Sequence, residues 1–299
     1  MILLDGKIAA EAMKKDIARE VARWTCEWGR RPHLAAILVG DNPASQTYVR
    51  NKENDCRQVG MDSSLYRLSS TISQEGLIEC VRTINEDPDI DGLIVQLPLP
   101  DHLDEQEIIG AIDPSKDVDG FHPVNVGCMV LGLPSFVSAT PAGIVDLLQY
   151  YNIPTQGKEC VIIGRSNIVG KPLANLLSRK GQGGDCTVTL CHSRTIDLPK
   201  ICRRANIIVA ALGQPGFLKA NMVKEGAVVI DVGISRVEDK TTKSGFRLAG
   251  DVDFVQVAPR CSHITPVPGG VGPMTRLSLL KNTLQAAIER KLNVKRIRL

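Results

Sequence analysis

A regular alternation of short β-branched runs with helical apolar patterns constrains the fold of this chain more than any other feature. Such alternation is typical of βαβ units, which build a mainly parallel sheet with helices on its faces. The 299 residues are too many for one ordinary core, so two domains are expected. The predicted strands are 34–39, 64–68 and 92–96 in the first half, and 160–163, 187–190, 207–211 and 228–232 in the second.

Capping signals and apolar stripes predict several helices. Asn42-Pro43 predicts a helix start with proline in the first turn, and Gly60 predicts its end. The segment 113–141 is rich in Pro, Gly and Asp without periodicity, so we expect a long functional loop. The polar segment 238–245 predicts an exposed hairpin or loop.

The last helix predicts how the chain is divided into domains. Leu277, Leu280 and Leu284 form an apolar stripe that needs a partner surface, and we expect it to pack on the first domain. The expected fold is two α/β domains flanking a cleft. Residues 1–140 plus 274–299 would form one domain, and 141–273 a Rossmann-like dinucleotide-binding domain.

Composition narrows the class of function. A net charge of +3 is too small to favour nucleic acid or an anionic membrane as a partner. No apolar run predicts a membrane span, and the first residues do not resemble a signal or transit peptide. The nine cysteines include no CxxC pair, which indicates reduced thiols and a cytoplasmic location, with the mitochondrion as the alternative. Cys191-His192 does not predict a metal site, because neighbours on a strand face opposite ways.

A glycine-containing turn follows the first strand of the second half. Gly164 permits a tight turn, Gly170 permits close packing of helix on strand, and Pro172 suits an early helical position. A strand, such a turn and a helix together present free backbone N–H groups to an anion. The spacing is not GxGxxG, so the turn alone is equally compatible with an ordinary βα connection.

The end of the next strand bears on cofactor choice. NAD-preferring sheets usually carry a carboxylate here, which binds the ribose 2′-hydroxyl. This chain has Ser193 and Arg194 instead, which favours a 2′-phosphate over a merely solvated strand end. Further on, Gly233 would let a planar ring approach the backbone, while Asp231 is equally explained as a turn former or a ligand.

Ser45, Tyr48 and Lys52 share one face of a predicted helix. Desolvation disfavours an ammonium, so a lysine in a partly dry cleft can accept and donate protons near neutral pH. Alone, these residues are better explained as a solvated helix face with a snorkelling lysine. A neighbouring feature favours catalysis. The apolar strand 92–96 ends in Gln96, at the carboxyl edge where ligands of open α/β sheets bind.

Five motifs stand in one order along the chain: Tyr48-x-x-x-Lys52, VQLPLP, KDVDGFH, GRSxxVGxP and TPVPGGVGPMT. By these motifs, the chain resembles the bifunctional methylenetetrahydrofolate dehydrogenase/cyclohydrolase family over roughly residues 1–290. The resemblance implies oxidation of 5,10-methylenetetrahydrofolate with NADP, hydrolysis of the methenyl product to 10-formyltetrahydrofolate, and a homodimer.

The resemblance also implies residue roles. The implied catalytic residues are Lys52, Tyr48, Gln96 and Asp119, and Asp119 would hold the pterin. Substrate-binding residues would further include Val95, Leu97, Pro268, Gly269, Gly270, Val271 and Gly272. Cofactor-binding residues would be Gly164, Arg165, Ser166, Ser193, Arg194 and Ile234.

Three alternatives remain. The loop 182–185 resembles that of an NAD-using branch assisted by magnesium and phosphate, although that branch carries arginine where this chain has Ser193. A dehydrogenase of amino or hydroxy acids would leave Tyr48, Lys52 and Gln96 without a task. A catalytically silent folate- or nucleotide-binding protein is the third. Arg276 stands where an apolar residue is expected, as a surface contact or a handle on the folate's acidic tail.

Overall fold

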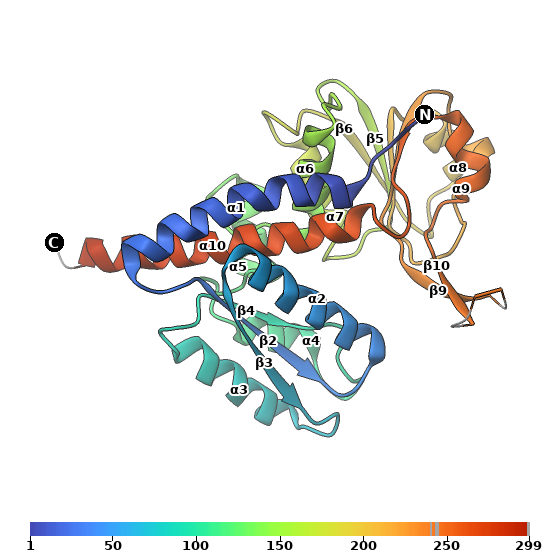
Figure 1. The fold of residues 1–299 in the computed structure, drawn as a ribbon. Coiled ribbons are helices and arrows are strands. Elements are labelled where there is room, and N and C mark those ends of the chain that lie inside the picture. The colour runs from blue at the N-terminus through green and yellow to red at the C-terminus, as the bar shows by residue number, and fades with distance from the viewer. Residues whose placement is uncertain (240, 243–244, 298–299) are drawn as a thin grey trace. The chain divides into compact units, whose positions relative to one another are not determined.

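The computed structural model describes residues 1–239, 241–242 and 245–297, with side chains described through residue 291. The chain forms two compact units (Figure 1). Unit 1 contains Met1–Glu11 and Thr140–Thr275, and unit 2 contains Ala12–Ala139 and the chain from Arg276 onward. Each unit is an α/β structure built on its own parallel sheet.

Unit 2 is built on a three-stranded parallel sheet in the order β3-β2-β4. The chain places β3 on one side of β2 and β4 on the other, so the order reverses between β2 and β4. In open parallel sheets, ligands bind beyond the carboxyl ends of the strands at such a switch point. The strands are β2 (His33–Val39), β3 (Asp62–Leu68) and β4 (Gly92–Val95), and the helices α1 (Gly6–Trp28), α2 (Pro43–Val59), α3 (Gln74–Glu86), α4 (Glu105–Ala111), α5 (Pro123–Leu131) and α10 (Val271–Ile297). Of these, α1 belongs to unit 2 from Ala12 onward and α10 from Arg276 onward.

The expected caps of α2 are confirmed. The Asn42 side chain accepts hydrogen bonds from the backbone N–H groups of Ala44 (2.9 Å) and Ser45 (3.2 Å). Gly60 ends the helix in the left-handed conformation, at φ 82°. These local signals determine where α2 begins and ends, and therefore which turn carries Lys52.

Unit 1 is built on a six-stranded parallel sheet in the order β1-β11-β8-β7-β5-β6, with its own switch point between β5 and β7. The central strands are buried on both faces, which explains their unbroken apolar sequences. The strands are β1 (Ile2–Leu3), β5 (Glu159–Ile163), β6 (Thr187–Cys191), β7 (Ile207–Ala210), β8 (Ala227–Asp231) and β11 (Cys261–Ile264), and the helices α6 (Ala139–Tyr150), α7 (Gly170–Ser178), α8 (Leu198–Cys202) and α9 (Phe254–Val257).

The N-terminal segment differs from the expectation. Residues 1–11 group with unit 1, not with the domain to which the sequence analysis assigned them. The reason is long-range pairing, because β1 adds to the sheet in parallel register with β11. Gly6 then lies so close to Gly270 that a Cβ on Gly6 would stand 1.8 Å from its carbonyl oxygen.

The expectation of an uninterrupted loop over 113–141 was wrong, because α5 lies within it. Pro123 occupies the first turn, and His122 Nδ1 accepts from the backbone N–H of Val124 (3.1 Å). Gly132 ends the helix at φ 71°. The capping residues of α5 are present in the sequence, but the helix is short and has no amphipathic apolar stripe from which it could be predicted.

The polar segment 238–245 is flanked by an antiparallel pair, β9 (Ser235–Glu238) and β10 (Phe246–Ala249). Residues 240 and 243–244, at the centre of that predicted hairpin or loop, lie outside the described residues.

Within the described part of the chain, no helix is long and apolar enough to cross a membrane.

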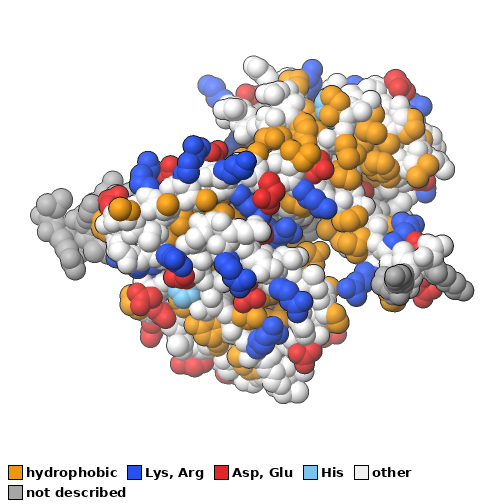
Figure 2. Space-filling model, in the orientation of Figure 1, with side chains coloured by type: hydrophobic (Ala, Val, Ile, Leu, Met, Phe, Trp, Pro, Cys, Tyr) orange, Lys and Arg blue, Asp and Glu red, His pale blue; other side chains and the backbone are white. Residues whose placement is uncertain are grey.

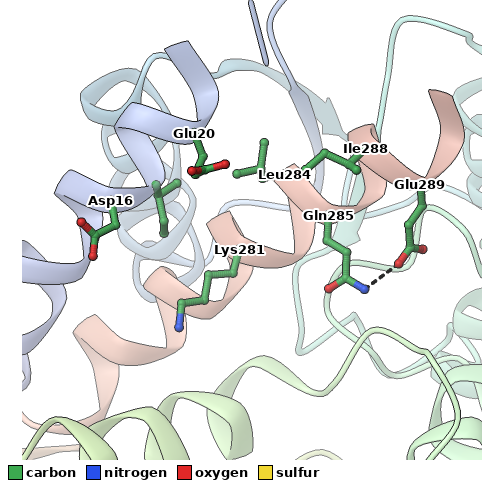
Figure 3. A pocket seen from close by; sticks show the side chains of 8 residues that line it. Asp16, Glu20, Lys281, Leu284, Gln285, Ile288 and Glu289 are labelled. Carbon is green, nitrogen blue, oxygen red and sulfur yellow. Dashed lines mark hydrogen bonds between the residues drawn. The ribbon is translucent and has the colours of Figure 1, made fainter. Parts of the chain in front are cut away.

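A hollow of about 500 Å³ opens between α1 and α10 in unit 2 (Figure 3). Ile17, Leu284 and Ile288 give it apolar walls, and on its rim Gln285 Nε2 donates to Glu289 Oε1 (2.7 Å). None of the catalytic, substrate-binding or cofactor-binding residues expected from the sequence lines it. The hollow therefore shows that α1 and α10 lie side by side, but it is not the candidate active site.

Candidate active site and dinucleotide site

The active-site candidate in unit 2 centres on Lys52 and Gln96. Lys52 lies on α2, which follows β2, and Gln96 comes directly after β4, so both belong to the switch point of the sheet. Lys52 Nζ donates a hydrogen bond to Gln96 Oε1 (3.2 Å), and Gln96 Nε2 donates to the Leu97 carbonyl (2.7 Å). This second bond orients the amide with its oxygen towards the ammonium. A neutral group thus holds Lys52.

Asp119 is the carboxylate associated with Lys52. Burial raises the pKa of Asp119, and the positive charge of Lys52 opposes that rise. Asp119 follows the single parallel bridge between Asp117 and Leu93, which brings the loop alongside β4. Among the described residues, Asp119 makes no hydrogen bond, so its oxygens are available to a ligand.

The other charged residues of the KDVDGFH loop are structural. Lys116 Nζ donates to the carbonyls of Ile84 (2.8 Å) and Asp87 (2.6 Å) at the end of α3, and burial lowers the pKa of Lys116 to about 8. Asp117 accepts from the backbone N–H of His122 (2.8 Å) at the start of α5, and burial raises its pKa to about 6. The structure thus singles out Asp119 from a loop with three charged residues.

The remaining residues expected in this half surround that pair unequally. Ser45 and Val95 are buried, while Leu97 is half-buried. Tyr48 is 39% exposed, so its ring can contact a ligand from outside the core. Tyr48 and Lys52 are therefore the accessible residues of the predicted helix face.

In unit 1, Gly164 lies at the switch point, directly after β5. Its φ is 123°, and a Cβ there would stand 2.0 Å from the carbonyl oxygen of Ala211, which follows β7. A Cβ on Gly170 would likewise stand 2.0 Å from the Gly164 carbonyl oxygen. Only glycine permits both approaches. The backbone here is therefore left uncovered for a ligand.

Ser166 organises the start of α7. Its Oγ accepts from the backbone N–H groups of Val169 (3.2 Å) and Gly170 (3.3 Å). Ser166 and Arg165 are both exposed. A hydroxyl, a guanidinium and a helix N-terminus together suit a phosphate group.

Ser193 and Arg194 occupy the turn beyond β6. The turn is closed by the backbone N–H of His192, which donates to Thr195 Oγ1 (2.8 Å), and by that of Arg194, which donates to His192 Nδ1 (3.1 Å). Ser193 and Arg194 are exposed, and no carboxylate follows the strand as far as Ile196. The turn therefore offers a hydroxyl and a positive charge.

Asp185, the last residue of the loop 182–185 that resembles the NAD-using branch, has a structural role. It adopts φ 59°, and its Oδ2 accepts from the backbone N–H of Gly181 (3.1 Å). It precedes the amino end of β6, whereas Ser193 follows the carboxyl end. The five residues of that strand, at roughly 3.3 Å each, separate Asp185 from the expected ribose site.

Asp231 is a turn former, one of the two roles left open by the sequence. Its carboxylate accepts from the backbone N–H groups of Gly233 (3.1 Å), Asp251 (2.8 Å) and Val252 (3.0 Å). Asp251, fully buried, in turn accepts from Leu212 N–H (2.6 Å). Sequence reasoning did not identify Asp251. Together the two carboxylates connect the segments that follow β7, β8 and β10 by hydrogen bonds.

Asp231 carries a testable pH dependence. Burial raises its pKa to about 7, so the folded protein keeps this proton to higher pH than the unfolded chain. The resulting stabilisation is present below the ordinary carboxyl pKa and is lost as pH rises through about 7. Asp231→Asn has no such loss. The stability difference between wild type and Asp231→Asn should change by roughly 2 kcal/mol between about pH 5 and 8, at the wild type's expense. Thermal unfolding at several pH values measures this, and a pH-independent difference would contradict it.

The segment 268–272 was expected to be a loop, but its last two residues form the start of α10. It lies in the same unit as Ile234. Gly269 adopts φ 108°, and the Val267-Pro268 peptide bond is cis. A Cβ on Gly272 would stand 3.8 Å from Ile234 Cδ1, so the segment and this 41% exposed side chain are neighbours. Ile234 is thus available to pack against a planar ring.

Family models match both halves of the chain. Residues 4–119 match the tetrahydrofolate dehydrogenase/cyclohydrolase catalytic domain, and residues 138–291 match the NAD(P)-binding domain of the same family. The chain belongs to the tetrahydrofolate dehydrogenase/cyclohydrolase family. Within this family, it is 60% identical to the bifunctional protein FolD of Porphyromonas gingivalis over 285 residues, which covers 95% of this chain and 96% of the relative.

Solved structures of the family have the same fold. The Campylobacter jejuni FolD methylenetetrahydrofolate dehydrogenase/cyclohydrolase is 46% identical, with a TM-score of 0.90 over 97% of this chain and 99% of that one. The Trypanosoma brucei enzyme, complexed with NADP cofactor and inhibitor, is 39% identical, with a TM-score of 0.92 over 98% of each chain.

Proposed function

We propose that this protein oxidises 5,10-methylenetetrahydrofolate with NADP and hydrolyses the resulting 5,10-methenyltetrahydrofolate to 10-formyltetrahydrofolate. The observation that carries the proposal is the placement of Lys52, held by the neutral Gln96 amide next to the available Asp119 carboxylate. Relatives at about 60% identity are named bifunctional proteins, which supports two activities on one chain.

In this proposal the residues of unit 2 hold the pterin. Asp119 accepts hydrogen bonds from the amide-and-amine edge of the ring, which matches a carboxylate with two oxygens free. Tyr48, Val95 and Leu97 supply aromatic and apolar contact. Pro268–Gly272, which belong to unit 1, are also proposed as substrate-binding residues.

The residues of unit 1 are proposed to bind NADP. The uncovered backbone at Gly164 and the N-terminus of α7, with Arg165 and Ser166, fit a pyrophosphate. Ser193 and Arg194 fit the 2′-phosphate, and Ile234 would pack on the nicotinamide. NADP, when bound, accepts the hydride from the methylene carbon, so this step needs no protein base.

Hydrolysis needs the protein. Water adds to the methenyl carbon, and its oxygen gives up both protons as it becomes the formyl oxygen. One proton is released, and one is taken up by the ring nitrogen as its bond to that carbon breaks. Lys52 can serve both transfers, because its Nζ is held in place by an amide that takes no proton itself. Gln96 therefore orients Lys52 without adding a charge to it.

A mixing experiment tests the proposal. Protein, methylenetetrahydrofolate and NADP should give the absorbance of the methenyl compound, followed by its decay. A dehydrogenase of another substrate gives no such absorbance, and a silent binding protein gives none while still binding folate. Faster turnover with NAD that requires magnesium and phosphate would place the chain with the NAD-using enzymes instead.

Location and assembly are also proposals. A cytoplasmic enzyme is proposed from the thiol-rich composition, and a homodimer from the family resemblance. Hydrophobic side chains gather over the region of unit 1 that carries α8 and α9 (Figure 2). Val255 on α9 is 81% exposed and Ile196, which precedes α8, is 88% exposed, which supports a covered apolar face in the assembled protein. The mass in solution, measured by sedimentation, tests the dimer.

A further inference from the structure

Asp55 lies on α2 one turn beyond Lys52, and two cations hold it. It is 5% exposed. Lys14 Nζ of α1 lies 2.6 Å from its Oδ1, and Arg276 Nε of α10 donates to its Oδ2. Lys14, itself buried, also donates to Gln58 Oε1 on α2 (2.9 Å). Three helices of unit 2 therefore meet at one carboxylate, and we call Lys14, Asp55 and Arg276 the Asp55 triad.

Stability alone is a poor reason for such a triad. The cost of removing charges from water offsets most of their attraction, so buried ion pairs are weak stabilisers compared with apolar packing. Their best-attested benefit is a defined register between elements. A rotation of α2 by one residue, about 100°, would carry Asp55 away from both cations. Apolar neighbours such as Val49 and Val59 resist rotation less, because dispersion contacts are not directional.

We propose that Lys14, Asp55 and Arg276 are positioning residues, which hold α2 in the rotation that keeps Lys52 Nζ at Gln96 Oε1. The proposal rests on the proposed role of Lys52 in hydrolysis. Lys52 and Asp55 are three residues apart on one helix, so any turn or slide of α2 that breaks the triad also displaces Lys52. In this proposal, Arg276 helps to hold α2 in place within unit 2, a role that the sequence alone did not indicate.

A second triad in unit 2 provides a matched control. Asp91, fully buried, accepts from Arg30 Nη2 (2.5 Å) and lies 3.6 Å from Arg290 Nη1 of α10. Arg276 and Arg290 are 14 residues apart, nearly four turns, and so face the same side of α10. Asp91 precedes the amino end of β4, whereas Gln96 follows its carboxyl end. The two triads have the same chemistry and both use α10, but Asp91 is separated from Gln96 by the whole of β4, whereas Asp55 is on the helix that carries Lys52.

The experiment compares Arg276→Met with Arg290→Met in the full-length protein. Both activities are measured with saturating NADP, and hydrolysis is also followed from added methenyltetrahydrofolate. Arg276→Met should lower kcat for hydrolysis about 10-fold, because misplacing a catalytic group by about 1 Å can cost up to roughly 100-fold. KM for the methenyl compound and kcat of the dehydrogenase should stay within about twofold, since neither depends on proton transfer by Lys52.

Arg290→Met should lower the midpoint of thermal unfolding by a similar amount and leave the ratio of the two activities unchanged. Arg276→Lys, which keeps the charge, should restore most of the hydrolysis. If Arg276→Met does not fold, Asp55→Asn is measured in its place and should lower the ratio of hydrolysis to oxidation, with Arg276→Lys as the control that keeps the charge. An unchanged ratio in the variant that removes a charge of the Asp55 triad, or an equal change in Arg290→Met, would overturn the proposal. A wild-type protein with neither activity would instead overturn the proposed function.

Discussion

Lys52→Gln should nearly abolish hydrolysis of the methenyl compound while some dehydrogenase activity survives. Glutamine keeps most of the length and can still donate a hydrogen bond to Gln96 Oε1, which lies 3.2 Å from Lys52 Nζ. It cannot titrate, and loss of a positioned acid or base typically costs on the order of 100- to 10,000-fold in the dependent step. Methenyltetrahydrofolate should accumulate, which its absorbance measures directly.

Two further variants are compared with Lys52→Gln, a second change at the same residue and a control at a surface lysine. Lys52→Met should reduce both activities, because it also leaves Gln96 Oε1 without its donor. Lys15→Gln, which removes an exposed lysine of α1, should change neither activity. Hydrolysis by Lys52→Gln at a rate near that of the wild type would remove Lys52 from the mechanism.

Ser193→Asp should change the cofactor preference. The new carboxylate would stand in the exposed turn beyond β6, where the 2′-phosphate of NADP is proposed to bind. Repulsion between a carboxylate and a phosphate about 4 Å apart should raise KM for NADP roughly 10- to 100-fold. KM for NAD, which carries a hydroxyl there, should change far less and can fall if the carboxylate accepts from it.

The control for this variant adds the same charge elsewhere on the same strand. Thr187→Asp places a carboxylate at the exposed amino end of β6, and it should leave both KM values within about twofold. Steady-state kinetics with the two cofactors provide the measurement. Equal effects of Ser193→Asp on NADP and NAD would refute the 2′-phosphate assignment of this turn.

Local features of the sequence determined much of the architecture. Apolar runs predicted the seven strands that form most of the two sheets, and the caps at Asn42 and Gly60 predicted the ends of α2. They could do so because strand and cap signals depend on residues within a few positions of one another. The motifs around Lys52, Gln96 and Gly164 could be found in the same way, since each lies directly beyond a strand or on the helix that follows one.

Only the tertiary structure decided the features that depend on distant parts of the chain. Residues 1–11 belong to unit 1 because β1 pairs with β11, some 260 positions away. Asp119 is the available carboxylate of its loop because the Asp117 side chain accepts a hydrogen bond at the start of α5. The neighbouring Lys116 donates to a carbonyl of α3. From the sequence, Arg276 was expected to make a surface contact or to bind the folate's acidic tail. In the structure, it donates a hydrogen bond from α10 to the Asp55 carboxylate. In each case the deciding partner is remote in sequence, and the free energy of burying or pairing a polar group depends on which partner the fold supplies.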